Sequence, residues 1–65
     1  MVYDKIVRYC KENGLSIMAF EKKCGLANAV VGKWENDKLK PSLSSLSKIA
    51  DATGIPIADW LKEEG

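Results

Sequence analysis

The sequence has no histidine, and only two cysteines stand among its 65 residues. Cys10 and Cys24 are far apart, and with no histidine beside them they exclude a Cys/His zinc site of ordinary spacing. The lack of histidine also excludes any histidine-dependent catalysis. There is no glycine-rich phosphate loop and no carboxylate pair with evident activation. We therefore expect no catalytic residues, no metal, no cofactor and no enzyme activity. We interpret the two thiols as small buried hydrophobes of a cytosolic protein, with a Cys10–Cys24 disulfide as the alternative.

Long apolar runs are also missing. No stretch approaches the roughly 18 residues of a membrane span, and residues 1–5 begin an amphipathic helix rather than a signal peptide. Hydrophobic residues make up 46% of the chain, and glycine and proline are few, which is a globular composition. We expect a single domain over residues 1–65, located in the cytoplasm, with no membrane partner and no room for a small-molecule ligand domain.

The chain also lacks a large excess of positive or negative side chains, and its net charge is only +1. Its distribution is uneven: residues 1–40 carry eight basic and five acidic side chains, and residues 41–65 carry two basic and four acidic ones. A positive front and a negative back would orient such a molecule toward a polyanion. An ordinary mixed surface is the alternative.

Apolar residues recur at helical spacing, and no segment alternates with the period of a strand. The pattern predicts an all-α fold with five helices. The first spans about 2–13 and ends at Gly14, and the second runs from the N-cap Ser16 to about 24 and ends at Gly25. The third ends near 35–36, the fourth runs from the N-cap Ser42 to Gly54, and a short fifth begins at Pro56. The expected core comprises Ile6, Leu15, Phe20, Val31, Trp34, Leu46, Ile49, Ile55 and Leu61.

The segment 16–35 contains two short helices joined by a tight turn at residues 25–27, which is the pattern of a helix-turn-helix. The motifs of the whole chain are Gly14-Leu15-Ser16, Gly25-Leu26, Trp34-Glu35-Asn36, Lys40-Pro41-Ser42, Lys48-Ile49-Ala50, Thr53-Gly54-Ile55 and Asp59-Trp60-Leu61. From about Ile6 to Leu61 the chain resembles the phage repressor/Cro-type helix-turn-helix family, in particular the regulators of phages and prophages of low-GC Gram-positive bacteria. The resemblance implies a compact five-helix repressor-type domain, with the helix-turn-helix formed by helices 2 and 3.

By that resemblance, the DNA bases are contacted by four residues at the outward front of the third helix: Asn28, Ala29, Gly32 and Lys33. Asn pairs with adenine, Lys donates to guanine, and an alanine methyl meets the methyl of thymine. Gly32 allows close approach, either to DNA or to a neighbouring helix. Asn28 has an alternative role as the N-cap of the third helix, and Lys33 has one as a solvated lysine.

The expected phosphate contacts are Ser16, Lys38, Lys40 and Ser42, because helix N-termini and exposed lysines suit anions. Solubility is the alternative role of the two lysines. Three positions depart from the family: Ile17 replaces a glutamine that touches phosphate, and Cys10 replaces an arginine that pairs with the glutamate at position 35. Glu21 replaces a small alanine, and a pair between Glu21 and Lys33 is one expectation.

The resemblance implies a sequence-specific regulator that binds a double-stranded DNA operator in the major groove, as a repressor or Cro-like protein, nucleoid-associated in a bacterial host. We expect a homodimer on DNA that associates weakly without it. The fifth helix is its expected contact surface and Trp60 the residue to test; that Trp60 simply closes the core is the alternative. A protein-interaction module such as an antitoxin or antirepressor is the alternative function, favoured by Ile17 and the low net charge.

Overall fold

The computed structural model describes residues 2–35 and 40–62, which form four α-helices and one short 3₁₀-helix. In chain order these are α1 (Val2–Asn13), α2 (Ile17–Cys24), η1 (Val31–Trp34), α3 (Leu43–Thr53) and α4 (Ile57–Leu61). No strand occurs within these described residues, in agreement with the all-α prediction. The prediction of five α-helices is wrong at the third element, because η1 is a single 3₁₀ segment of four residues.

Local capping sets the helix ends where the sequence predicted them. The hydroxyl of Ser16 accepts a hydrogen bond from the Ala19 N–H at 3.0 Å, and the hydroxyl of Ser42 accepts one from the Ser45 N–H at 3.1 Å. Each satisfies a donor that the first helical turn leaves without a partner. After α2, Gly25 adopts a φ of 70° in the left-handed region, where a side chain would be strained.

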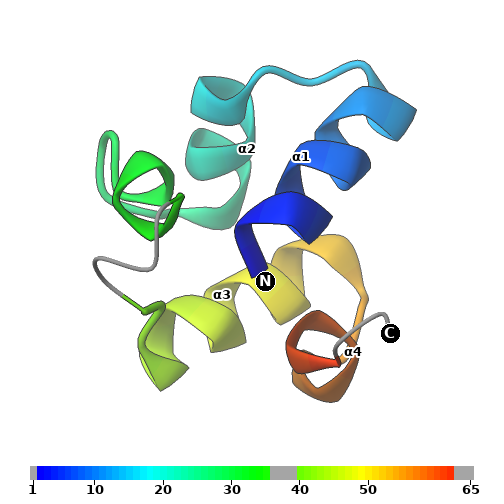
Figure 1. The fold of residues 1–65 in the computed structure, drawn as a ribbon, viewed down its shortest axis with the longest axis vertical. Coiled ribbons are helices and arrows are strands. Elements are labelled where there is room, and N and C mark those ends of the chain that lie inside the picture. The colour runs from blue at the N-terminus through cyan, green and yellow to red at the C-terminus, as the bar shows by residue number, and fades with distance from the viewer. Residues whose placement is uncertain (1, 36–39, 63–65) are drawn as a thin grey trace.

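The helices surround a core to which each contributes one face (Figure 1). α3 packs against both α2 and α4, and α1 contacts α2, η1 and α4. The Lys5 Nζ donates a hydrogen bond of 2.7 Å to the backbone oxygen of Asp59, which ties the first helix to the last. None of the helices in the described ranges is long and apolar enough to cross a membrane.

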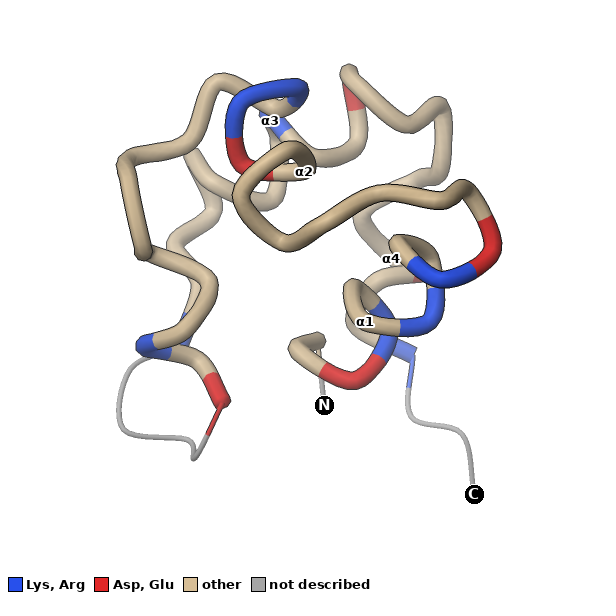
Figure 2. Tube along the Cα trace, turned by 90° about the horizontal axis from the view of Figure 1, so that it is seen from above, with Lys and Arg blue, Asp and Glu red and all other residues tan. Residues whose placement is uncertain are grey.

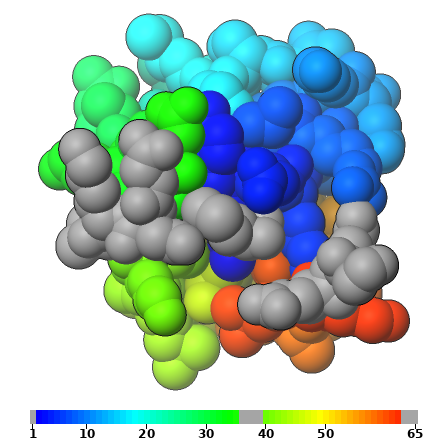
Figure 3. All heavy atoms as spheres, viewed as in Figure 1, coloured from blue at the N-terminus to red at the C-terminus, as the bar shows by residue number. Residues whose placement is uncertain are grey.

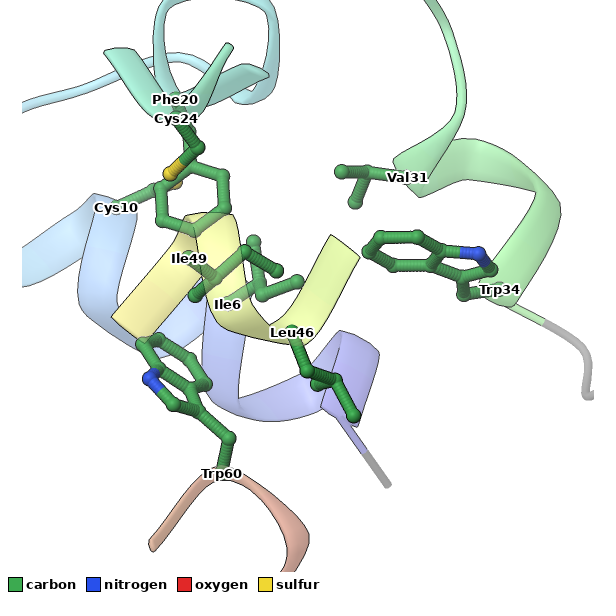
Figure 4. Packing of buried hydrophobic residues seen from close by; sticks show 9 residues of the cluster. All are labelled: Ile6, Cys10, Phe20, Cys24, Val31, Trp34, Leu46, Ile49 and Trp60. Carbon is green, nitrogen blue, oxygen red and sulfur yellow. The ribbon is translucent and has the colours of Figure 1, made fainter. Parts of the chain in front are cut away.

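Figure 4 shows the side chains that fill this core. They are Ile6, Cys10, Phe20, Cys24, Val31, Trp34, Leu46, Ile49 and Trp60. Leu15 and Ile55, which the sequence placed in the core, are only half-buried.

The fifth expected helix, α4, is rotated relative to the prediction. Leu61 was expected in the core but is 55% exposed, whereas Trp60 is 3% exposed. The indole of Trp60 packs edge-to-face on Tyr9 and Phe20, with ring centroids 6.0 and 6.3 Å apart. Because adjacent helical residues point in different directions, burying Trp60 turns Leu61 outward. Trp60 therefore closes the core, which was the alternative interpretation, and is no exposed anchor for a partner.

Cys10 and Cys24 are both buried and free. Burial raises the pKa of both thiols above the usual value. For Cys24, the nearby Lys23 opposes that rise in pKa and Cys10 adds to it. The two cysteines therefore act as small core side chains, and no disulfide joins them in this structure.

Candidate nucleic-acid interface

The segment that follows α2 makes a sharp turn and leads into η1 at one edge of the molecule. In Figure 1 this green segment lies on the left, between α2 and the beginning of α3. The turn starts with two hydrogen bonds that close the end of α2: the Leu26 N–H donates to the Glu21 backbone oxygen at 2.8 Å, and the Gly25 N–H donates to the Lys22 oxygen at 3.2 Å. This is the Schellman arrangement, which fixes the direction in which the chain leaves a helix.

Backbone-to-backbone hydrogen bonds in the following segment are of the 3₁₀ type. Three N–H groups each donate to the carbonyl three residues earlier: Val30 to Ala27, Lys33 to Val30, and Glu35 to Gly32, at 3.1–3.4 Å. Ala29 has a φ of 62°, which is rare for a residue other than glycine. Two adjacent β-branched valines and Gly32 all have low helix propensity, so the local sequence gives little support to a regular α-helix here.

Glu21 replaces the missing helical hydrogen bonds at the start of this segment. Its side chain is only 4% exposed, and it reaches from α2 to the backbone of the segment. Oε1 accepts a hydrogen bond from the Ala29 N–H at 3.2 Å, and Oε2 accepts one from the Val31 N–H at 2.9 Å. The expected pair of Glu21 with Lys33 is not formed among the described residues. Because Glu21 occupies these amides, Asn28 is not the residue that caps the segment.

All four residues expected to contact bases are exposed: Asn28, Ala29, Gly32 and Lys33. Figure 3 shows the segment as green atoms on the left of the molecular surface. Val31 and Trp34 point into the core, so the division between inward and outward residues agrees with the prediction. A Cβ built on Gly32 meets no described atom within 4 Å. Close approach to a neighbouring helix is therefore no reason for this glycine, and open space lies in front of it.

Of the expected phosphate-contacting residues, Ser16 and Ser42 cap α2 and α3, and Lys40 is exposed just before α3. Lys38 lies outside the described residues. The Ser42 hydroxyl also donates to the Ser45 hydroxyl at 3.1 Å, so both serine hydroxyls are engaged within their helices. What remains for an anion at these two positions is the backbone N–H groups of the first helical turn.

Among residues 2–35 and 40–62, charged side chains are spread over several elements rather than gathered on one side. In Figure 2, Lys and Arg positions lie on several elements, and Asp and Glu positions lie close to many of them. The exposed Lys22 and Lys23 form the last turn of α2, next to the turn that leads to η1. Lys22 and Lys23 were not among the residues expected to contact DNA, although their place in the last turn before Gly25 indicates that they lie close to the turn.

The departures from the family pattern have local explanations. Ile17 is half-buried and packs against the core, so its presence no longer favours a protein-interaction module. Cys10 belongs to the core, and its Sγ donates to the Ser16 backbone oxygen at 3.9 Å. Glu35 is exposed to solvent. Glu21 was singled out from the sequence as a carboxylate at a position where a small side chain is usual, but its partners are the backbone N–H groups of Ala29 and Val31 and not Lys33.

A family model described as helix-turn-helix matches residues 6–60. No curated protein and no solved structure matches. The matched range includes all of α2, the turn and η1, together with α3 and most of α1 and α4.

Proposed function

The chain belongs to the helix-turn-helix family of DNA-binding regulators, and we propose that it binds one specific double-stranded DNA sequence through the exposed face of residues 28–33. The observation that carries this proposal is the exposure of Asn28, Ala29, Gly32 and Lys33 on a segment whose other side chains are fixed in the core. A segment that is anchored by buried side chains and exposes its opposite edge suits recognition in the major groove.

Each exposed residue offers a different contact to a base edge. The amide of Asn28 matches the paired donor and acceptor of adenine, and the ammonium of Lys33 matches the two acceptors of guanine. The methyl of Ala29 suits the methyl of thymine. Gly32 leaves open space in which the backbone approaches the DNA closely.

Phosphate contacts flank this face. The first-turn N–H groups behind Ser16 and Ser42 and the exposed ammonium of Lys40 are the donors, and Lys38 joins them in the proposal on the basis of the sequence alone. These contacts hold the protein on any duplex and carry no sequence information by themselves.

The type of regulator is inferred from the resemblance of the sequence motifs to the phage repressor/Cro-type family. We propose one repressor- or Cro-like domain over residues 1–65, of the kind found in regulators of phages and prophages, which acts on a bacterial operator as a homodimer. Such a protein works on the nucleoid in the cytoplasm.

The first test is selection of binding sites from random duplex DNA, followed by affinity measurements on the selected duplex and on a scrambled one across a salt titration. A specific DNA-binding protein prefers the selected duplex and loses affinity steeply as salt rises. If neither duplex is bound, the proposal fails and a protein-interaction role takes its place.

Two substitutions separate base contacts from phosphate contacts. Lys33→Ala is expected to cost about 1–3 kcal/mol on the selected duplex and to relax the preference at one base pair. Lys40→Ala is expected to weaken both duplexes alike and to reduce the salt slope by about one. Lys11→Ala, at an exposed lysine of α1, is the control and leaves both affinities unchanged. Equal weakening of both duplexes by Lys33→Ala would make Lys33 a phosphate contact.

A further inference from the structure

Glu21 is bonded to both halves of the helix-turn-helix. Its backbone oxygen accepts the Leu26 N–H that ends α2, and its carboxylate accepts the N–H groups of Ala29 and Val31. One residue thus fixes where the turn leaves α2 and where the exposed segment begins.

A buried carboxylate is stable only when hydrogen bonds replace the water it has lost, and Glu21 is almost fully buried. The N–H groups of Ala29 and Val31 need an acceptor as well. The N–H groups that donate to carbonyls three residues earlier are those of Val30, Lys33 and Glu35. Displacing the carboxylate therefore leaves the two N–H groups without an acceptor and the carboxylate without donors. Hydrogen bonds to a charged acceptor are among the stronger ones in proteins.

We propose that Glu21 is the positioning residue for sequence recognition: its carboxylate fixes the backbone of Ala29 and Val31, and thereby the placement of the side chains offered to the bases. The inference rests on the proposed DNA binding. Glu21 itself touches no DNA, since its side chain lies behind the segment and is shielded from solvent.

The consequence for binding is selective. Base contacts require an accurate placement of Asn28 and Lys33, because a shift of about 0.5 Å already weakens a paired hydrogen bond. Phosphate contacts come from the beginnings of α2 and α3 and from Lys40, none of which is held by Glu21. Loss of the carboxylate therefore reduces the preference for the selected sequence and leaves general affinity for duplex DNA in place.

The test uses the full chain with Glu21→Gln, which keeps the size of the side chain but replaces one acceptor by a donor. Glu21→Asp is the second variant, because it keeps the charge and shortens the reach. Glu35→Gln is the matched control: it removes the same charge at an exposed position directly after η1. All proteins are compared at a temperature where circular dichroism shows each of them folded.

Two quantities are measured. Amide hydrogen exchange in the free protein is expected to accelerate about tenfold at Ala29 and Val31 in both Glu21 variants, and not in the control. The ratio of affinities for the selected and scrambled duplexes is expected to fall about tenfold in both Glu21 variants, with the affinity for the scrambled duplex unchanged. A ratio that falls in Glu21→Gln but not in Glu21→Asp would assign the effect to charge and overturn the proposal.

Other outcomes also decide the matter. An equal loss of affinity for both duplexes, or an unchanged ratio despite faster exchange, overturns the positioning role. If the wild-type protein shows no preference between duplexes, the proposed function itself fails, and that result is visible before any variant is compared.

Discussion

Ala29 holds a left-handed backbone conformation with a φ of 62° and has an exposed side chain. For an L-residue with a Cβ this conformation costs about 1–2 kcal/mol, whereas glycine adopts it freely. The neighbouring hydrogen bond from the Ala29 N–H to Glu21 maintains the conformation in the folded state. The strain therefore lies in the same backbone unit that Glu21 fixes.

We expect Ala29→Gly to raise the free energy of unfolding by about 0.5–1 kcal/mol, since relief of strain exceeds the extra entropy that glycine loses on folding. Urea unfolding measures the change. The matched control is Ala58→Gly, at an exposed position inside α4, which is expected to lower stability by about 1 kcal/mol. Destabilisation by both substitutions would show that the positive φ at residue 29 is not a source of strain in solution.

At the scale of single elements, serine hydroxyls cap the beginnings of α2 and α3. Ser42 both accepts the Ser45 N–H and donates to the Ser45 hydroxyl. By contrast, Pro56 before α4 and Val30 before η1 have no side-chain cap. α3 is therefore capped by a serine next to it in the sequence, whereas the N–H groups at the start of η1 are bound by Glu21 of another element.

Ser42→Ala is expected to lower the free energy of unfolding by about 1 kcal/mol, the usual cost of losing a helix N-cap. Ser47→Ala, at an exposed position in the middle of α3, is expected to raise it by about 0.5 kcal/mol because alanine favours the helix. Thermal unfolding of both variants gives the comparison. Equal effects in the same direction would mean that the Ser42 hydroxyl does not cap α3.

The sequence predicted α2 and α3 well because their signals are local: a serine at the start, a glycine at the end, and an apolar stripe between them. For α1 the signals were the apolar stripe and Gly14 at its end. The prediction failed at η1 because Val31 and Trp34 are spaced for either an α-helix or a 3₁₀-helix. Glu21, ten positions before Val31, accepts the Val31 N–H from another element, and a contact of this kind is not visible in the local spacing. The prediction failed at Leu61 because α4 is too short for periodicity to choose which of two adjacent apolar residues faces inward.

For the candidate site, the division of residues 28–34 into exposed and buried positions followed from the apolar pattern and is confirmed. The roles of the exposed residues toward DNA stay predictions. The hydrogen-bond partners of the Glu21 carboxylate could not be predicted from spacing, because they are backbone N–H groups, which every residue except proline carries. A charged side chain at a position between two packed elements was the only visible sign.

At the scale of the whole molecule, the described chain extends 27 × 24 × 21 Å. Half-sites one DNA turn apart are centred about 34 Å from each other, which is farther than the longest extent of the described chain, so two bound copies reach each other only at their edges and over a small area. Interfaces of that size associate weakly by themselves. Leu61, exposed at the end of α4, is the apolar side chain that we expect at this contact in place of the buried Trp60.

We therefore expect a monomer in sedimentation experiments and two occupied half-sites in footprints on the selected DNA. Leu61→Ser is expected to leave stability nearly unchanged, since the side chain is already largely in water, and to reduce the cooperativity between half-sites. Leu61→Met keeps the apolar surface and is the control. A footprint of one half-site with one protein per duplex would contradict the dimer, and full cooperativity in Leu61→Ser would place the contact elsewhere.

The two tryptophans of the core belong to different parts of the fold. Trp34 comes from η1 and Trp60 from α4, and Figure 4 shows them at separate ends of the labelled cluster. Since both are buried, the fluorescence of each indole shifts to longer wavelength when its surroundings open to water. In a Trp60→Phe variant the emission reports only on η1, and in Trp34→Phe only on α4. If the unfolding curves measured by emission and by circular dichroism coincide in both variants, the domain unfolds as one cooperative unit. An earlier shift in the first variant would show that η1 opens while the rest of the domain stays folded. Tryptophan emission of that variant would then report on the opening of η1 in the presence of DNA.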